Sequence, residues 1–84
     1  MSALRITIRN ALVPSELIDV ESWGSDTVGS VKDQVASYLG LDPSVAFLSY
    51  QGYVLDDEQT LQSIPINDGA ELMILLRGTV GQQE

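Results

Sequence analysis

Residues 27–40 read TVGSVKDQVASYLG, and the predicted fold is built around the helix that they form. Its valines at 28, 31 and 35 and its leucine at 39 recur at intervals of three and four residues, which places them on one side of an α-helix. Thr27, or Asp26 before it, supplies a side-chain oxygen that can cap the helix, and Gly40 supplies a C-terminal stop. The spacing therefore predicts one amphipathic helix with a single buried face.

Strand patterns lie on both sides of that helix. Runs of alternating or mainly apolar residues predict strands at 4–9, 18–21, 46–50, 53–55 and 71–76. We expect the first two strands to pair as a hairpin across a turn at 10–15 that contains Pro14, and Gln51–Gly52 to form a second, tight turn. The order ββαββ predicts an α+β fold in which a mixed sheet of four to five strands wraps one helix.

Composition excludes most kinds of chemistry. The 84 residues, 44% of them apolar, suit one small domain with a thin stability margin. Neither Cys nor His is present, which removes Ser-His-Asp and Cys-His catalysis, the usual zinc sites and an imidazole pH switch. The acidic run 56–58 lacks the spaced loop with which proteins surround a hard cation. We expect no catalytic residue, no metal ion, no cofactor and no enzymatic activity.

The charge of the chain points to protein partners. Twelve acidic and four basic side chains give a net charge of -8, which repels phosphate backbones and anionic lipid headgroups. No apolar run approaches the roughly 20 residues of a membrane-spanning helix, and the N-terminal residues lack the pattern of a signal peptide. We expect a soluble, cytoplasmic monomer that binds neither nucleic acid nor membrane.

Four segments together resemble ubiquitin, in order and with nearly matching spacing. They are SDTVGSVK at 25–32, GLDP at 40–43, YQGYVLDDEQTL at 50–61 and LLRG at 75–78. The resemblance covers about residues 4–78, with a short insertion around 14–23. It implies the β-grasp fold, in agreement with the strand and helix pattern. It also predicts a ubiquitin-like domain over residues 1–78, followed by a flexible tail or connector over 79–84.

The resemblance gives the single lysine of the chain a structural role. Lys32 matches the ubiquitin lysine that is largely buried and paired with an acidic residue after the fourth strand, which here is Asp57. We expect this ion pair to orient the helix, because removal of one partner would leave a poorly solvated charge. The other ubiquitin lysines are replaced here, so the domain is not expected to form ubiquitin chains through side-chain amines.

The main binding patch of ubiquitin lies on the outer face of its third and fifth strands. The matching positions are Ser49, Met73 and Leu75, with Leu12 as the candidate from the hairpin loop and Phe47 beside the patch. A serine at the centre removes the burial of an aliphatic side chain, worth about 2 kcal/mol, which would weaken ubiquitin receptors more than tenfold. Met73 and Leu75 are either such an exposed patch or are covered by a loop.

The C-terminal residues depart from the ubiquitin pattern. Conjugable members of the family end in Gly-Gly, because the activating enzyme threads a slim carboxylate through a narrow channel. Arg77 matches an arginine by which that enzyme selects ubiquitin. In the segment from Gly78 to Gly81, however, Val80 puts a branched side chain where the first of the two glycines should be. The pattern predicts a tail that is neither activated nor cut.

Three functions agree with these features. Some relatives of ubiquitin head small ribosomal proteins, so the leading prediction is a permanent N-terminal fusion to a small-subunit ribosomal protein, acting as a folding and assembly aid on the small subunit. The charge of -8 would offset a lysine-rich partner. The alternative is a ubiquitin-mimicking interaction module that docks through Phe47, Met73 and Leu75. A third function is a protein modifier activated at Gly81 after trimming of residues 82–84.

Overall fold

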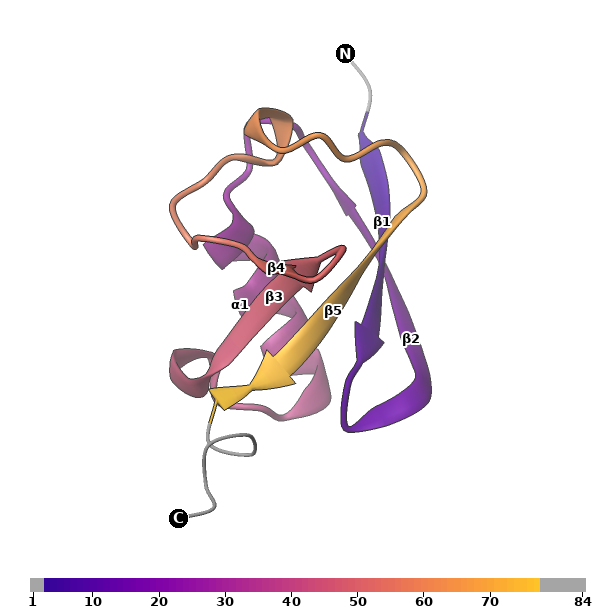
Figure 1. Ribbon diagram of the computed structural model, residues 1–84, viewed down its shortest axis with the longest axis vertical. Helices are drawn as coiled ribbons and strands as arrows, with labels where there is room; N and C mark the ends of the chain where they lie inside the picture. The colour runs from indigo at the N-terminus through magenta and orange to yellow at the C-terminus, as the bar shows by residue number, and fades with distance from the viewer. Residues whose placement is uncertain (1–2, 78–84) are drawn as a thin grey trace.

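A computed structural model describes residues 3–77 as one sheet with a single α-helix against it (Figure 1). The elements are β1 (Leu4–Asn10), β2 (Val13–Ser22), α1 (Val28–Leu39), η1 (Pro43–Val45), β3 (Ala46–Tyr50), β4 (Tyr53–Val54), η2 (Leu61–Ser63) and β5 (Ala70–Leu76). The predicted α+β class is confirmed. The strand predicted at 53–55 is present as the two-residue β4, so the full order is ββαβββ, and the shorter order ββαββ omits this strand.

The five strands form one mixed sheet in the order β2-β1-β5-β3-β4. β1 and β5 are parallel, and the other neighbouring strands are antiparallel. The first and last strands of the sequence thus lie side by side at the centre, as Figure 1 shows, and the first hairpin extends the sheet on one side. This arrangement is the β-grasp fold that the sequence predicts.

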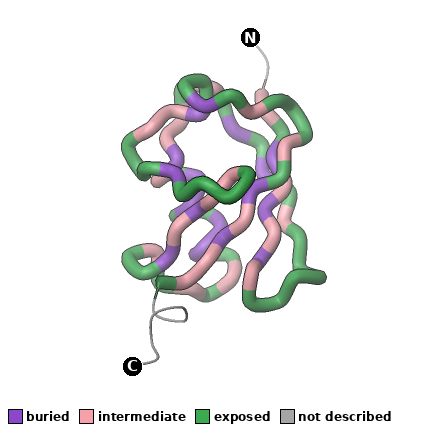
Figure 2. Tube along the Cα trace, in the orientation of Figure 1, coloured by how far each residue is buried: buried purple, intermediate pink, exposed green. Residues whose placement is uncertain are grey.

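The core lies between α1 and the inner face of the sheet. Thr27 Oγ1 accepts a hydrogen bond from the Ser30 N–H at 3.1 Å and begins the helix, and Gly40, at φ 75°, ends it. The helix buries its three valines against residues that alternate along β1, β3 and β5, as the banding in Figure 2 shows. The most deeply buried side chains of this core are Ile6, Ile8, Val28, Val31, Val35, Leu48, Leu61, Leu72 and Ile74.

β2 is longer than the sequence pattern predicts. The predicted turn at 10–15 is wrong, because the turn consists of Ala11 and Leu12 alone and the strand already begins at Val13. Pro14 is tolerated inside the strand because β2 lies at the edge of the sheet, where a missing N–H costs no ladder bond on the open side. A shift in register between Arg9 and Asn10 accommodates the tight connection.

The Lys32–Asp57 pair is present and fixes a loop to the helix. Lys32 Nζ lies 2.7 Å from Asp57 Oδ2, with 9% of the lysine side chain and 51% of the aspartate side chain exposed. The backbone adds to this attachment, because the Gly29 N–H donates to the Asp57 carbonyl at 2.9 Å. A Cβ at Gly29 would lie only 3.2 Å from that carbonyl oxygen, so a glycine fits this contact best. The pair and the backbone bond together hold the loop after β4 on the first turn of α1.

Candidate binding surface

The outer face of the sheet carries a continuous row of side chains from one edge to the other. Directly opposed residues of neighbouring strands point to the same face of a sheet. Leu17 opposes Arg9, and Arg9 opposes Met73. Met73 opposes Ser49, and Ser49 opposes Val54. The row therefore crosses all five strands and passes through the centre of the predicted patch.

Four of the five predicted patch residues form two adjacent pairs. Ser49 opposes Met73 in the row, and Phe47 opposes Leu75 in the next position along β3 and β5. All four side chains are half-buried, so each keeps part of its surface open to solvent. The structure thus brings Phe47, Ser49, Met73 and Leu75 together, and does not bury Met73 or Leu75 under a loop in the described part of the chain.

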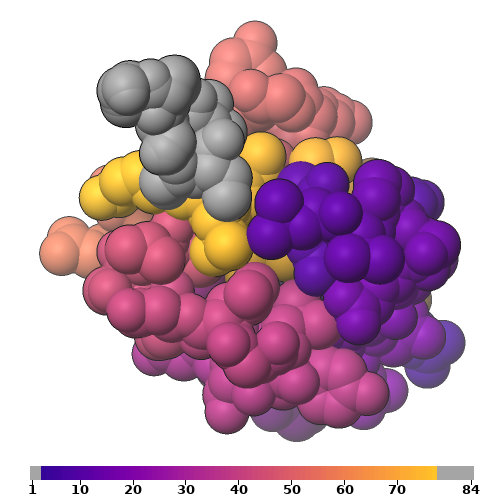
Figure 3. All heavy atoms as spheres, turned by 90° about the horizontal axis from the view of Figure 1, so that it is seen from below, coloured from indigo at the N-terminus to yellow at the C-terminus, as the bar shows by residue number. Residues whose placement is uncertain are grey.

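The fifth predicted residue, Leu12, lies at one end of this face. The β1–β2 turn is attached to β5, because the Ala11 N–H donates to the Ile74 carbonyl at 3.0 Å. Buried Asn10 supports the same turn by accepting from the Leu12 N–H at 2.9 Å. Figure 3 views the molecule from this end and shows the indigo-to-purple hairpin against the yellow end of β5. Half of the Leu12 surface is exposed there (50%).

A charge pair lies beside the apolar groups. Arg9 Nε donates to Glu71 Oε2 at 2.7 Å, and Arg9 Nη1 donates to the carbonyl of Pro14. The hydrogen bond from Arg9 lowers the pKa of the Glu71 carboxyl, and the same bond raises the pKa of Arg9. Both groups are accessible to water. The pair makes the middle of the row polar and separates Leu17 from Met73.

We define the outer-face surface as the row from Leu17 to Val54, the neighbouring pair of Phe47 and Leu75, and Leu12 in the adjoining turn. Its members are Leu12, Leu17, Phe47, Ser49, Val54, Met73 and Leu75, with Arg9 and Glu71 as its charge pair. Val54 was missed by the sequence interpretation, although a two-residue turn at 51–52 would have aligned it with Ser49. Leu17 was missed because the second strand was expected to begin one residue later.

The predicted tail residues divide between the described and the undescribed part of the chain. Arg77 follows β5 directly, is exposed, and lines a hollow together with Phe47 and Asp57. Gly78, Val80 and Gly81, with the predicted connector 79–84, lie outside the described residues. Their assignment remains a prediction from sequence.

Residues 3–77 show neither of two other kinds of site, a metal centre or a membrane-spanning helix. No group of three or more acidic, histidine or cysteine side chains there is arranged to hold a metal ion. No helix of this part of the chain is both long and apolar enough to cross a membrane. The outer-face surface is therefore the candidate functional site of this part of the chain.

Comparison with known proteins places the chain among ubiquitin-like proteins. The model of the ubiquitin family matches residues 6–79. The UV excision repair protein RAD23 homolog of Dictyostelium discoideum is 28% identical over 74 residues, which are 88% of this chain and 21% of that protein. The chain therefore spans about a fifth of the length of this relative.

Solved structures show the same fold. Caldiarchaeum subterraneum ubiquitin is 29% identical with a TM-score of 0.83, and the match covers 90% of this chain and 95% of that one. A ubiquitin-like domain from Arabidopsis thaliana has a TM-score of 0.81 over 100% of this chain and 87% of that one. Its identity of 24% makes it evidence for the fold alone. These neighbours confirm the β-grasp arrangement.

Proposed function

Because the chain belongs to the ubiquitin family, we propose that it is a protein-interaction module that docks partners through the outer-face surface and is not itself conjugated. Ubiquitin-like domains are in general non-enzymatic, and the proposal needs no chemistry. The observation that carries it is the alignment of Met73 with Ser49 and of Leu75 with Phe47 on adjacent strands, with all four side chains partly open to solvent. Apolar groups gathered on an exposed sheet face are typical of a protein interface.

The composition of the surface determines which partners it prefers. Its centre is polar, because Ser49 stands between Met73 and Val54. Its margins are apolar, with Phe47 and Leu75 on one side and half-exposed Leu12 at the end. A receptor that buries an aliphatic centre loses affinity here, whereas a receptor that grips the margins retains it. The module is therefore a selective relative of ubiquitin.

A titration tests the docking proposal. The ¹⁵N-labelled chain is titrated with a panel of ubiquitin-binding domains, and amide shifts are expected at Phe47, Ser49, Met73 and Leu75. Met73→Ala should weaken binding, and Ser49→Ile should strengthen it more than tenfold by restoring about 2 kcal/mol of aliphatic burial. Absence of shifts below millimolar concentration for every domain and for the proteasome would contradict the proposal.

Two features support the absence of conjugation: the chain has a single lysine, and its tail lacks the Gly-Gly end of a modifier. The only lysine, Lys32, is nearly buried and paired with Asp57, so it is a poor acceptor for a further modifier. Val80 occupies the position of the first glycine of a modifier end. A chain trimmed to end at Gly81 should form no thioester with a ubiquitin-activating enzyme, whereas the variant with Val80→Gly should. A thioester on the unaltered trimmed chain would show that the protein is a modifier.

A finer form of the proposal makes the module the permanent head of a small-subunit ribosomal protein. The net charge of -8 supports it, because an acidic head reduces premature contact of a basic body with RNA. An antibody to the domain, used on a ribosome gradient of its own cells, tests this form. Co-sedimentation of a heavier band with small subunits is expected, and a free band near 9.1 kDa would contradict the fusion while leaving the docking proposal intact.

A further inference from the structure

A hollow opens beside the outer-face surface, where β4 ends. β4 pairs with β3 at Ser49 and Tyr50, so within residues 3–77 no strand lies beside the first residues of β3 on that side. The chain after β4 turns toward the helix instead, where the Lys32–Asp57 pair attaches it. The space left between β3 and this loop has a volume of about 560 Å³, which is enough for a long side chain.

The side of the hollow that belongs to the sheet is apolar. Val54 opposes Ser49 across the strands, and Phe47 lies two residues before Ser49 along β3, so the three share the outer face. Phe47 is half-buried and Val54 is 64% exposed. Both line the hollow, together with buried Leu55. The space is therefore flanked by one aromatic ring and by exposed aliphatic surface.

The side of the hollow that belongs to the loop is acidic. Asp56, Asp57 and Glu58 line it, and all three are exposed. Lys32, which also lines the hollow, neutralises Asp57 at a distance of 2.7 Å. In the described part of the chain, the Asp56 carboxylate accepts one hydrogen bond, from the Glu58 N–H at 3.1 Å, and the Glu58 carboxylate has no partner. Asp56 and Glu58 therefore keep acceptor positions for a cation.

Backbone hydrogen bonds hold this acidic side in position. The Leu55 N–H donates to the Leu48 carbonyl at 2.8 Å, which attaches the start of the loop to β3. The Val28 N–H donates to the Gln59 carbonyl at 2.9 Å, which attaches its end to the first turn of α1. A loop fixed at both ends loses little conformational freedom when a partner binds, so more of the contact free energy appears as affinity.

The acidic hollow is defined by Phe47, Val54, Asp56 and Glu58. We propose that it receives an arginine side chain of a protein partner. The aliphatic stem would cover Val54, and the planar guanidinium would stack on Phe47. The guanidinium would also donate hydrogen bonds to Asp56 and Glu58.

Shape and charge both favour arginine as the occupant. A lysine has neither a fork of donors that binds carboxylates in pairs nor a plane that stacks on a ring. The net charge of -8 favours the approach of a basic partner. Arg77 lines the hollow as well and opposes a further cation, so the site suits one arginine rather than a basic cluster. The inference rests on the docking function proposed above, because Phe47 and Val54 also belong to the outer-face surface, and it specifies the partner.

A series of three synthetic peptides tests the choice of side chain. Each peptide has the sequence Gly-Leu-X-Leu-Gly with blocked ends, and X is arginine, lysine or citrulline, which has nearly the shape of arginine without its charge. Titration of the arginine peptide into the ¹⁵N-labelled full chain should shift the amides at 47 and 54–58. The citrulline peptide should bind about tenfold more weakly, and the lysine peptide about threefold more weakly. Equal affinity of the arginine and citrulline peptides, or no shifts at 54–58, would overturn the proposal.

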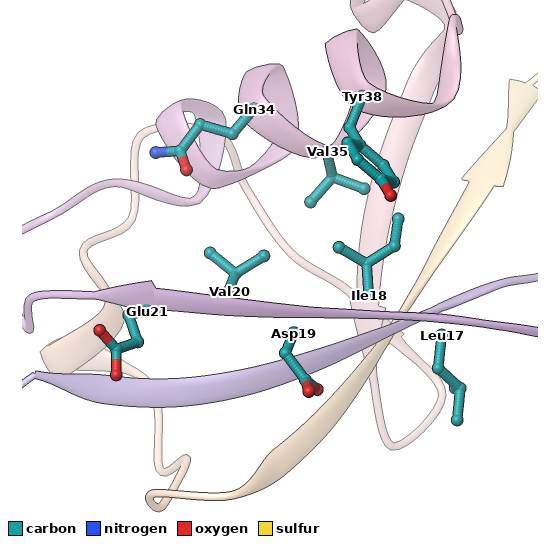
Figure 4. A pocket seen from close by; sticks show the side chains of 8 residues that line it. All are labelled: Leu17, Ile18, Asp19, Val20, Glu21, Gln34, Val35 and Tyr38. Atoms are coloured by element: carbon teal, nitrogen blue, oxygen red, sulfur yellow. The ribbon is translucent and has the colours of Figure 1, made fainter.

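Two double variants separate the hollow from general charge attraction. Asp56→Asn with Glu58→Gln should weaken the arginine peptide about tenfold, and the asparagine keeps an oxygen for the N–H of residue 58. Asp19→Asn with Glu21→Gln changes the net charge equally on β2, at the opposite edge of the sheet. Figure 4 shows both of these carboxylates pointing away from α1. Their loss should change the affinity less than about twofold, and equal losses from the two double variants would mean that only net charge attracts the peptide.

Two single variants test the other sides of the hollow. Phe47→Leu should weaken the arginine peptide about threefold, because it keeps an apolar surface and removes the ring. Arg77→Gln should strengthen binding about twofold, because it removes a like charge from the hollow. Unchanged binding by Phe47→Leu, or weaker binding by Arg77→Gln, would contradict the proposed position of the guanidinium.

Met73→Ala distinguishes the acidic hollow from the docking function. Met73 is not among the residues that line the hollow, so this variant should bind the arginine peptide unchanged while it binds ubiquitin-binding domains more weakly. If the domains shift the outer-face amides and the arginine peptide shifts none at 54–58, the acidic hollow is wrong and the docking function stands. If the peptide binds and no domain does, the outer-face proposal fails and the arginine site stands.

Discussion

The two faces of the sheet differ more than their residue types suggest, and β5 shows it within one strand. Leu72 and Ile74 point inward and are each 1% exposed, whereas Met73 and Leu75 point outward and remain half-buried. All four side chains are aliphatic or thioether groups of similar size. Position in the alternation, rather than chemistry, decides which of them hold the fold together. The inner face should therefore control stability and the outer face should control binding.

The largest expected effect is the loss of stability when an inner-face side chain is truncated, compared with truncation of its outer-face neighbour. Ile74→Ala should lower the free energy of unfolding by about 3 to 4 kcal/mol, because it removes buried methyl groups and leaves a cavity in the core. Met73→Ala, one residue away, should cost less than about 1 kcal/mol while it weakens partner binding. Urea unfolding of both variants measures the difference. Equal losses of stability would mean that the outer face is covered in solution.

The second largest effect on the free energy of unfolding is expected at the Lys32–Asp57 ion pair, on the helix side of the sheet. Asp57→Asn should cost about 3 kcal/mol, because it leaves a lysine of 9% exposure without its partner. Lys32→Met should cost less than about 1 kcal/mol, because the carboxylate left behind is 51% exposed and water can solvate it. Urea unfolding compares the two variants with the double variant, which should resemble Lys32→Met. A larger loss from Lys32→Met would contradict this asymmetry.

The inner face could be predicted from sequence because its signals are local. Apolar spacing fixes the helix at Val28, Val31 and Val35, and alternation fixes the buried side of β1 and β5. The Lys32–Asp57 pair joins residues 25 positions apart, and no local pattern contains it. It was expected through the resemblance to ubiquitin alone.

The outer-face surface was less predictable because it depends on how the strands are placed in space. The full row needs the register of four strand pairings, and a second strand that began at Ile18, as the sequence pattern predicts, would have left Leu17 out of it. Sheet order follows from pairings between distant residues, so no local pattern places Leu17 in one row with Met73.

A smaller change in the free energy of unfolding is expected at Ser22, a polar residue on the otherwise apolar inner face. Ser22 is 2% exposed at the end of β2, and its hydroxyl has no hydrogen-bond partner among the described residues. A buried polar group without a partner costs free energy, so Ser22→Ala should raise the free energy of unfolding by about 1 kcal/mol. Urea unfolding measures the gain, with Ser30→Ala, an exposed helix position, as the comparison. A loss of stability would mean that the Ser22 hydroxyl finds a partner in solution.

The smallest effect belongs to the charge pair on the outer face and appears as a dependence on pH. The hydrogen bond from Arg9 lowers the pKa of Glu71, so the folded state binds this proton less tightly than the unfolded state. The resulting stability is present above the unfolded pKa of about 4.3 and is lost as pH falls through the lower, folded value. Without histidine in the chain, stability should stay nearly constant between about pH 6 and 8.

Variants at two carboxylates assign this acid dependence. Glu71→Gln should flatten part of the fall in stability below about pH 4.3, measured by urea unfolding across the acid range. The rest should remain, because hydrogen bonds from Ser44 lower the pKa of Asp42 in the same direction. Asp42→Asn is therefore the matched control and should remove a separate part. If stability fell with acid as steeply in Glu71→Gln as in the unaltered chain, the Arg9–Glu71 pair would add nothing to stability. The pair would then have a role in partner selection alone.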